Sequence, residues 1–392
     1  MAALRILVLG GCGIQGKAAV LDLVNSPAVT EVICADLDPK GIASLSAAID
    51  MAKVRCERLD ANDADHLVRL CRQAHVLVDL LPRQFMETVC QAAIRAGVGV
   101  VNTNYAYPIA HLNDAAREAN VAIMPECGLD PGIDLVLYGE ARRRFDELQV
   151  INSYCGGFPE RAACDNPLDY KVSWVFEGVL AATKRRSRFI RSGAVIDIDA
   201  KDQHDPAHVQ ALDFPGLGTL EAIPNGDAVF FTDALGVTAT IRETGRYSLR
   251  WPGWSAFWRP LKQLGFLDET PVAGLPCAVS PYQLVDKLLA PQLQYGRDEK
   301  DLVAMLNVFE GRRDGRRTRL TSRLLIERDL RTGLMAMAQG VGYPAAIVAR
   351  MIASGEIPEK GLLSPMTHVP YPAFIDALQR RNIQVEELQT AL

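Results

Sequence analysis

A glycine cluster near the start of the chain is the clearest chemical signal in the sequence. Gly11, Gly13 and Gly16 have the G-x-G-x-x-G spacing, with an apolar run at 4–9 before them and a helix-like stretch after them. The first glycine permits a tight turn, the second lets backbone approach a pyrophosphate, and the third lets helix and strand pack closely. The helix N-terminus adds partial positive charge. The residues expected at the diphosphate of a dinucleotide are Gly11, Gly13, Ile14, Gln15 and Gly16.

An acidic residue, Asp36, ends the second expected strand about 20 residues further on. Its carboxylate would accept hydrogen bonds from the ribose hydroxyls and repel a 2′-phosphate, and no arginine is adjacent to it in sequence. The sequence therefore predicts NAD rather than NADP, with Lys40 as the one residue that argues for NADP. Asp60 is expected near the adenine, and Leu81 and Pro82 beside the nicotinamide half.

Three side chains could move a proton or steer a cation in the crevice where such sheets bind ligands. Asp130 follows the sixth strand, and its alternative role is that of a turn residue before proline. Tyr105 lies past the fifth strand, where it could instead be a rim aromatic that covers the nicotinamide. Lys171 could bind a carboxylate or relay a proton, or form an ordinary ion pair. Glu126 is a further carboxylate on the same stretch as Asp130.

Regular alternation of strands and helices in the first third of the chain must position these residues. It predicts an α/β fold with a doubly wound parallel sheet of the Rossmann type. The strands are expected at 5–9, 31–35, 54–58, 75–80, 99–102 and 121–124, and the helices at 15–25, 39–52, 64–72, 85–96 and 112–120.

The pattern changes after residue 132, where longer β-like runs predominate around a helix at 254–264. We expect a dinucleotide-binding domain at 1–132 and an α+β substrate and dimerisation domain at 133–332. A C-terminal segment at 333–392 would return to the first domain. It begins with one long helix at 333–353 that is interrupted at 342–344.

Composition narrows the class of protein. A net charge of −5 argues against nucleic-acid and anionic-membrane partners, and no apolar run is long enough to span a bilayer. No secretory signal precedes the first strand, and the nine cysteines are scattered without a C-x-x-C pair. A cytoplasmic, metal-free homodimer acting on a small molecule is therefore expected, with His204 and His208 in a surface loop.

Several further stretches resemble the saccharopine dehydrogenase family and follow one another in the family's order. They are 101–105, 126–134, 153–157, 165–168, 170–174, 224–227, 241–247 and 341–344. The resemblance implies an enzyme of lysine metabolism that uses a nicotinamide nucleotide to interconvert a C–N single bond and an imine. The family's substrate contacts carry over to Asn104, Tyr105, Asp130, Cys155, Trp174 and Thr244. Asn104 stands where the family's reductase branch has serine.

Three positions depart from the saccharopine reductase branch and look like the lysine 6-dehydrogenase branch. Gly226 and Glu177 each replace an arginine, and Asp36 replaces an arginine-bearing strand end suited to NADP. Glu177 would pair with a substrate ammonium, or else face solvent on a helix. Arg242 or Arg246, one or the other, is left to anchor an α-carboxylate.

These observations predict an NAD-dependent enzyme, similar to lysine 6-dehydrogenase, that oxidises a side-chain amine to an imine or semialdehyde. The alternatives within enzymes are a saccharopine dehydrogenase, acting by glutamate formation or by reductive condensation, and a carboxyspermidine-type dehydrogenase. The alternative of another class is a sensor that binds NAD without turnover. Such a sensor would lack convergent polar groups in the crevice, whereas Tyr105, Asp130 and Lys171 indicate that such groups are present.

Overall fold

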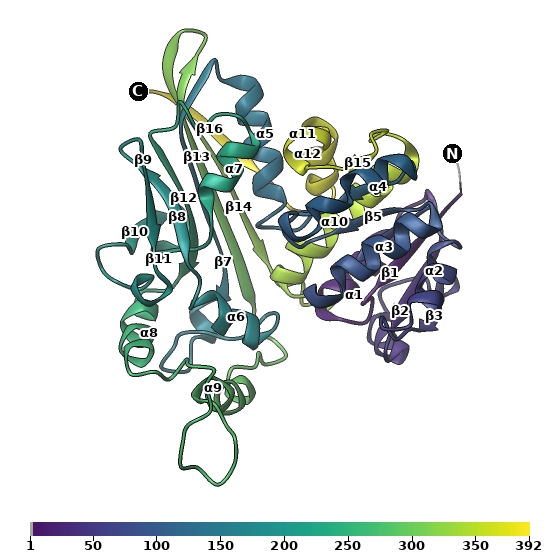
Figure 1. Ribbon diagram of the computed structural model, residues 1–392, viewed down its shortest axis with the longest axis horizontal. Helices are drawn as coiled ribbons and strands as arrows, with labels where there is room; N and C mark the ends of the chain where they lie inside the picture. Colours follow the sequence, from purple (N-terminus) through teal and green to yellow (C-terminus); the bar gives the residue numbers. More distant parts are fainter. Residues whose placement is uncertain (1–2) are drawn as a thin grey trace. The chain divides into compact units, whose positions relative to one another are not determined.

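The chain folds into two compact units that do not coincide with contiguous stretches of sequence. The computed structural model describes residues 3–392. The first unit comprises residues 1–140 and 329–384, and the second comprises 141–328 and 385–392. Helix α5 (Ile133–Arg144) carries the chain from the first unit into the second. Each unit is built on its own β-sheet, and Figure 1 labels the elements of both.

The first unit contains a parallel seven-stranded sheet in the order β15-β6-β5-β4-β1-β2-β3, which is the doubly wound arrangement predicted from the sequence. The strands that pair β1 on either side place their carboxyl ends beside the glycine loop. The strands are β1 (Leu4–Leu9), β2 (Val29–Asp36), β3 (Val54–Arg58), β4 (Val76–Asp79), β5 (Gly99–Asn102), β6 (Ala122–Met124) and β15 (Gly361–Leu362).

Helices cover both faces of this sheet, because the central strands β1, β2 and β4 bury side chains on both sides. Two of them, α2 (Ala64–Cys71) and α3 (Met86–Ala96), close an apolar core that includes Leu7, Leu9 and Leu77. The other face packs against α1 (Ile14–Val24) and α10 (Ala336–Ser354). Shorter helices complete the unit, namely α4 (Asn113–Glu118), α11 (Pro365–His368) and α12 (Tyr371–Gln379).

Two expectations for this unit are wrong. The helix expected at 39–52 is replaced by the 3-10 turns η1 (Pro39–Leu45) and η2 (Met51–Lys53), because the Asp38 and Asp50 side chains accept backbone N–H groups two residues further on. The helix expected to break at 342–344 is continuous in α10 and contains Pro344.

A close approach of α1 and α10 explains the glycine in the middle of α10. A Cβ atom at Gly342 would lie 2.5 Å from the Gln15 carbonyl oxygen and 2.8 Å from the Ala18 Cβ. The two helices can therefore pack at this distance only where one of them lacks a side chain. The N-terminal half of α1, which begins at the glycine loop, is held in this way by the C-terminal part of the chain.

The second unit is built on a mixed sheet whose central strands are unusually long. Its main path runs β10-β11-β12-β7-β13-β14-β16, and β8 pairs with both β12 and β9. The strands are β7 (Glu147–Pro159), β8 (Ser187–Arg191), β9 (Ala194–Ile198), β10 (Gln210–Phe214), β11 (Gly218–Pro224), β12 (Glu243–Arg250), β13 (Asp301–Arg313), β14 (Arg316–Glu327) and β16 (Glu386–Ala391).

The two faces of this second sheet differ in character. Alternate residues of the long strands, such as Tyr154 and Leu306, join an apolar core with the aromatic residues Trp254 and Trp258. The residues between them point to the opposite face, and they include Thr244 and Cys155, which are expected at the substrate. The helices of this unit are α6 (Phe176–Ala182), α7 (Ala228–Ala234), α8 (Trp254–Gln263) and α9 (Pro281–Leu289).

Candidate functional site

The glycine loop leaves no room for side chains at the points where its own backbone folds back. A Cβ atom at Gly16 would lie 2.1 Å from the Gly10 carbonyl oxygen, and one at Gly11 would lie 2.6 Å from the Cys34 Sγ. Gly13 differs, because its Cβ would meet only one atom, at 3.2 Å, and it is the N-cap of α1 without a side-chain cap. The loop therefore forms a cradle in which a diphosphate can approach backbone N–H groups.

The acid at the end of β2 is half-buried and has a structural role. The Asp36 carboxylate accepts a hydrogen bond from the Cys12 backbone N–H at 3.0 Å, so that it fixes the glycine loop. Parallel pairing of β2 with β3 places Arg58 directly beside Asp36. The Arg58 guanidinium is exposed, and neighbouring positions in register point their side chains to the same face. A cation therefore does accompany Asp36, but it comes from the next strand.

The loop that follows β6 is tied to the end of β5 by backbone hydrogen bonds. Glu126 donates its N–H to the Asn104 carbonyl at 3.0 Å, and its buried side chain accepts from the Ala106 N–H at 3.1 Å. Its φ of 61° is a left-handed conformation that a non-glycine residue rarely adopts. Strained residues of this kind concentrate at ligand sites, which makes Glu126 a stronger candidate than its sequence context indicated.

The turn that carries Asp130 closes on itself within a few residues. Asp130 and Pro131 are joined by a cis peptide bond, and a Cβ atom at Gly132 would lie 1.8 Å from the Gly128 carbonyl oxygen. Asp134, which the sequence analysis did not single out, accepts the Gly132 N–H at 2.8 Å. Burial, together with the nearby Glu126 carboxylate, raises the pKa of Asp134 to about 8. Three acidic residues thus belong to one short segment at the carboxyl edge of the sheet.

Residues expected around the cofactor's two halves have different surroundings. Tyr105 is half-buried, and its ring centroid lies 6.1 Å from that of Tyr107. Asn104 donates its N–H to the Asn102 side chain at 3.0 Å. Asp60 is exposed and accepts hydrogen bonds from the Asn62 backbone and side chain, which lower its pKa. Both hydrogen bonds use the same carboxylate oxygen, and the contact of Asp60 with the adenine stays a prediction.

The end of β4 contains an acid that the sequence analysis passed over. Leu81 is half-buried and Pro82 is exposed, as a rim position requires. Just before them, Asp79 is buried on the face that includes Leu77, and it accepts the Leu81 N–H at 3.1 Å. Burial raises the pKa of Asp79 to about 7. An acid inside an apolar strand carries no periodic signal, which explains why it was missed.

In the second unit, two residues carried over from the family and one of the two expected carboxylate anchors lie on one face of the sheet, since β12 pairs with β7 in register. Thr244 donates its hydroxyl to the Ile151 carbonyl at 2.7 Å. Cys155 is buried on the same face. Arg246 is 1% exposed, and its guanidinium lies 4.5 Å from the centre of the Phe231 ring. Arg242 is exposed, so the structure favours Arg246 of the two alternative carboxylate anchors.

The prediction of a catalytic role for Lys171 is corrected by its ion pairs. Its ammonium group lies 2.8 Å from an Asp165 oxygen and 2.7 Å from a Glu299 oxygen. Burial lowers the pKa of Lys171, but hydrogen bonds to the two carboxylates outweigh it and hold this pKa above its ordinary value. A lysine that is bound by two carboxylates stays charged, and therefore it cannot act as a base. Lys171 instead joins two distant segments of the second unit.

Two residues near α6 were expected at the substrate. Trp174 is half-buried, and its ring fills the space above Gly178, where an added Cβ would lie 2.3 Å from the ring. Glu177 is exposed in the first turn of α6, and its backbone carbonyl accepts the Tyr282 hydroxyl at 2.9 Å. The structure therefore favours the solvent-facing alternative for Glu177 and corrects its expected pairing with a substrate ammonium.

An arginine from another segment lies beside the position where the family's arginine is missing. Gly226 has a φ of 88°, a conformation that a larger side chain rarely adopts. Next to it, Asn225 accepts a hydrogen bond from the Arg185 guanidinium at 2.9 Å. A guanidinium from position 185 therefore lies next to position 226, where this chain has glycine. No spacing rule in the sequence would have indicated this.

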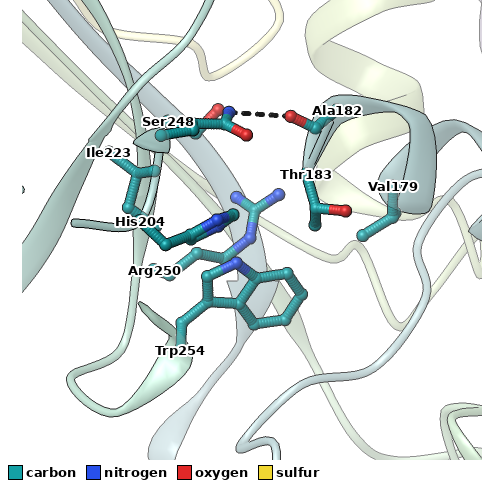
Figure 2. A pocket seen from close by; sticks show the side chains of 9 residues that line it. Val179, Ala182, Thr183, His204, Ile223, Ser248, Arg250 and Trp254 are labelled. Carbon is teal, nitrogen blue, oxygen red and sulfur yellow. Dashed lines mark hydrogen bonds between the residues drawn. The ribbon is translucent and has the colours of Figure 1, made fainter. Parts of the chain in front are cut away.

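A small cavity in the second unit lies next to the buried His204. Figure 2 shows His204, Arg250 and Trp254 around it, and its volume of about 10 Å³ is too small for an amino acid. Burial lowers the pKa of His204 to about 3. The expectation that His204 belongs to a surface loop is wrong, because Lys262 and the residues of Figure 2 enclose it.

The fold and the cradle together define a nucleotide-dependent oxidoreductase of two units. One family model, the saccharopine dehydrogenase NADP binding domain, matches residues 6–128, and the saccharopine dehydrogenase C-terminal domain matches residues 128–383. The chain belongs to the saccharopine dehydrogenase family.

Relatives match over most of the chain. An enzyme of Schizosaccharomyces pombe named saccharopine dehydrogenase [NADP(+), L-glutamate-forming] is 28% identical over 84% of this chain and 87% of its own. A protein of the same name from Pyricularia oryzae is 26% identical over 99% of both chains. The solved structure of apo saccharopine dehydrogenase (L-Glu forming) from Saccharomyces cerevisiae has a TM-score of 0.84 over 99% of this chain and 100% of its own, at 23% identity. This likeness confirms the predicted fold class.

These findings overturn the predicted preference for NAD. The matching family model is that of an NADP binding domain, and the two relatives are named as NADP(+) enzymes. The prediction of NAD depended on the absence of an arginine next to Asp36 along the chain. In the sheet, however, pairing of β2 with β3 places Arg58 next to Asp36. Among residues 3–392, no helix is long and apolar enough to cross a membrane. The homodimeric state and the cytoplasmic location stay predictions.

Proposed function

We propose that this protein is an NADP-dependent saccharopine dehydrogenase of the glutamate-forming type. The observation that carries the proposal is the match of both saccharopine dehydrogenase family models, which together span residues 6–383. In the proposed reaction, a hydride leaves the carbon next to the secondary amine and an imine forms. Water then hydrolyses the imine to glutamate and a semialdehyde, with release of one proton. Bound NADP would accept the hydride.

The first unit supplies a cradle that fits a dinucleotide diphosphate. The spaces above Gly11 and Gly16 are closed by the protein's own atoms, whereas the space above Gly13 is bounded by one atom, the Gly10 carbonyl oxygen at 3.2 Å. Arg58, beside Asp36, would pair with the 2′-phosphate of NADP, and Lys40 is a second exposed cation close by in sequence. A guanidinium can form charge-assisted hydrogen bonds with phosphate oxygens, which compensates for the acid at the strand end.

The second unit supplies cations for a substrate with several carboxylates. Arg246 is buried on the face of the sheet that also includes Thr244 and Cys155. Arg185, which reaches Asn225, replaces the arginine that Gly226 lacks. Saccharopine has three carboxylates, whereas lysine has one. Two guanidinium groups on neighbouring strands and loops therefore match the larger substrate better.

Proton transfer is assigned to the segment that follows β6. We propose that Asp130 and Tyr105 contact the substrate nitrogen, as their motifs indicate. Asp134, with a pKa of about 8, holds a proton at neutral pH and is coupled to Glu126. The Glu126 backbone is held by the Asn104 carbonyl. Lys171 has no part in this proposal, because its ammonium is bound by Asp165 and Glu299.

The surroundings of the three positions that favoured a lysine 6-dehydrogenase support the saccharopine dehydrogenase proposal instead. Asp36 is accompanied by Arg58, Glu177 is exposed, and Arg185 compensates for Gly226. The relatives also carry the saccharopine dehydrogenase name. Oxidation of lysine, as in a lysine 6-dehydrogenase, is therefore the alternative that the experiment below must exclude.

The test is an assay of nucleotide reduction with saccharopine or lysine, each with NADP and NAD. We expect turnover with saccharopine and NADP, and the reverse reaction with glutamate, semialdehyde and NADPH. Mass spectrometry should identify glutamate as the product. Turnover of lysine alone, with no reaction of saccharopine, would contradict the proposal. Arg185→Met should raise the KM for saccharopine about tenfold, whereas Arg186→Met, an exposed neighbour, should leave it unchanged.

A further inference from the structure

Three polar residues on neighbouring strands form a row across the centre of the second sheet. Asn307 of β13 lies directly opposite Ser153 of β7 on one side and Ser322 of β14 on the other. Directly opposite residues of paired strands point their side chains to the same face. We call Ser153, Asn307 and Ser322 the polar row. On β12, Arg246 pairs with Ser153 and extends the row by one strand.

The polar row is buried, and its polar atoms have no hydrogen-bond partner within the part of the chain that the structure describes. Ser153 is 1% exposed, and Asn307 and Ser322 are 0% exposed. The two serine hydroxyls are without partners, as are both the amide nitrogen and the amide oxygen of Asn307. Buried polar groups are almost always hydrogen-bonded, because leaving water without a new partner is costly. Three adjacent exceptions on one face indicate that something outside the polypeptide supplies the partners.

The arrangement of charges around the polar row limits what that partner is. The Arg246 guanidinium lies at one end, against Phe231 of α7. At the other end, Ser322 pairs with Glu387 of β16, whose carboxylate binds Arg144 at 2.6 Å. Asn307 offers one donor group and one acceptor group, and each serine hydroxyl can serve as either. Such a set matches a ligand that is itself both donor and acceptor, as an α-amino acid head group is.

The spacing of the strands indicates how long the ligand must be to reach both Arg246 and Asn307. Neighbouring strands lie ~4.8 Å apart, so the backbones of Arg246 and Asn307 are separated by roughly 10 Å. A substrate with a single amino acid head group needs only one end of this distance. A substrate in which two amino acid skeletons share one nitrogen has carboxylates far enough apart to use both ends.

We propose that the polar row binds one amino acid head group of the substrate, while Arg246 binds a carboxylate of the other. The Asn307 amide nitrogen donates to a carboxylate oxygen, and its amide oxygen accepts from the ammonium group. The hydroxyls of Ser153 and Ser322 complete the contacts on either side. This inference rests on the proposed function, and it adds substrate-binding residues from β13 and β14.

The decisive variant is Asn307→Leu, which preserves the approximate size of the side chain and removes both polar groups. We expect the KM for saccharopine to rise at least tenfold, with kcat changed less than threefold and NADPH affinity unchanged by fluorescence titration. Ser322→Ala and Ser153→Ala should each raise this KM about threefold. Ser255→Ala is the matched control, because that hydroxyl is also buried without a partner but belongs to α8.

A merely structural row would give a different result. Removing a buried amide that has no ligand should raise the melting temperature of Asn307→Leu and leave KM unchanged, and this outcome would overturn the proposal. If Asn307→Leu does not fold, the two serine variants, which each remove a single hydroxyl, decide the question by the same comparison of KM with the control.

Calorimetry separates failure of this inference from failure of the proposed function. Saccharopine, glutamate and lysine are titrated into the wild-type protein and into each variant, with NADPH present so that saccharopine binds without being oxidised. If the wild type and the variants bind saccharopine with equal affinity, the proposed role of the polar row is wrong and the proposed function is unaffected. If the wild type binds glutamate or lysine but not saccharopine, and the variants bind that amino acid more weakly, the proposed function is wrong and the polar row is still a binding site. A wild type that binds none of the three contradicts both.

Discussion

The glycine loop of the first unit and the polar row of the second represent two ways of building a binding site. The loop is made of backbone, and its defining residues lie within seven consecutive positions, from Gly10 to Gly16. The polar row is made of side chains, and more than a hundred residues of chain separate two of its members, Ser153 and Asn307. A local backbone site leaves a spacing that can be recognised in the sequence. A site assembled across strands is recognisable only when strand register is known.

The largest effect should come from adding a side chain to a glycine of the loop. Gly16→Ala should reduce NADPH affinity more than 100-fold and lower the melting temperature, because its Cβ would lie 2.1 Å from the Gly10 carbonyl oxygen. Gly13→Ala should weaken NADPH binding more than tenfold with little change in melting temperature, since its Cβ meets only one atom at 3.2 Å. Equal melting temperatures for the two variants would break the comparison. Fluorescence titration and thermal unfolding measure both properties.

The next effect concerns the buried cation of the second sheet. Arg246→Met keeps an unbranched side chain next to Phe231 but removes the charge. We expect kcat/KM for saccharopine to fall about 100-fold, since losing a charge-assisted pair costs roughly 2–3 kcal/mol. Steady-state kinetics measure the change, and Arg242→Met is the control because Arg242 is exposed just before the same strand. A smaller loss in Arg246→Met than in Arg242→Met would show that the sheet face has been assigned wrongly.

A smaller effect should sharpen the account of the nucleotide. Arg58→Gln should weaken NADPH binding about tenfold and leave NADH binding unchanged, because the guanidinium would contact only the 2′-phosphate. Arg72→Gln, another exposed arginine of the first unit, should change neither affinity. Titration with both reduced nucleotides is the measurement. If Arg58→Gln weakened both equally, Arg58 would support the loop rather than select NADPH.

The smallest effect is one of stability and depends on pH. Burial raises the pKa of Asp79 to about 7 from an ordinary value of 3.8, so the folded state favours the protonated acid. The folded state therefore loses stability as pH rises from about 4 to 7, and the loss is constant above that window. Asp79→Asn should raise the melting temperature by several degrees at pH 8 and leave it unchanged near pH 4. A pH-independent difference would mean that Asp79 is not buried as an acid.

Much of the first unit could be predicted from the sequence, because hydrophobic alternation and glycine spacing are local properties. All six strands expected there are present, and the loop forms where the spacing placed it. The failures also have local or register-dependent causes. Side chains of Asp38 and Asp50 compete with helix formation, and Arg58 reaches the position beside Asp36 only through pairing of β2 with β3.

The second unit was predicted less completely, because its site depends on contacts between distant segments. Lys171 finds Glu299 across 128 positions, which converts an expected proton relay into an ion pair. Arg185 reaches Asn225 across 40 positions and places a guanidinium next to Gly226. Family motifs located Thr244 and Arg246, but they gave no indication of Asn307 or Ser322. Only the pairing of β13 with β7 and β14 places those two residues beside the others.

The packing of α1 against α10 has a consequence for how the protein is made. A ribosome synthesises the glycine loop first, but the helix that supports it, α10, spans Ala336–Ser354. The apolar side of α1 around Ala18 therefore stays uncovered while every strand of the second sheet except β16 is being translated. The second unit in turn waits for β16, whose last residue is Ala391. The first unit is complete only after residue 384 has been synthesised and the second only after β16, and a nascent chain released before α10 would have the nucleotide cradle without its support.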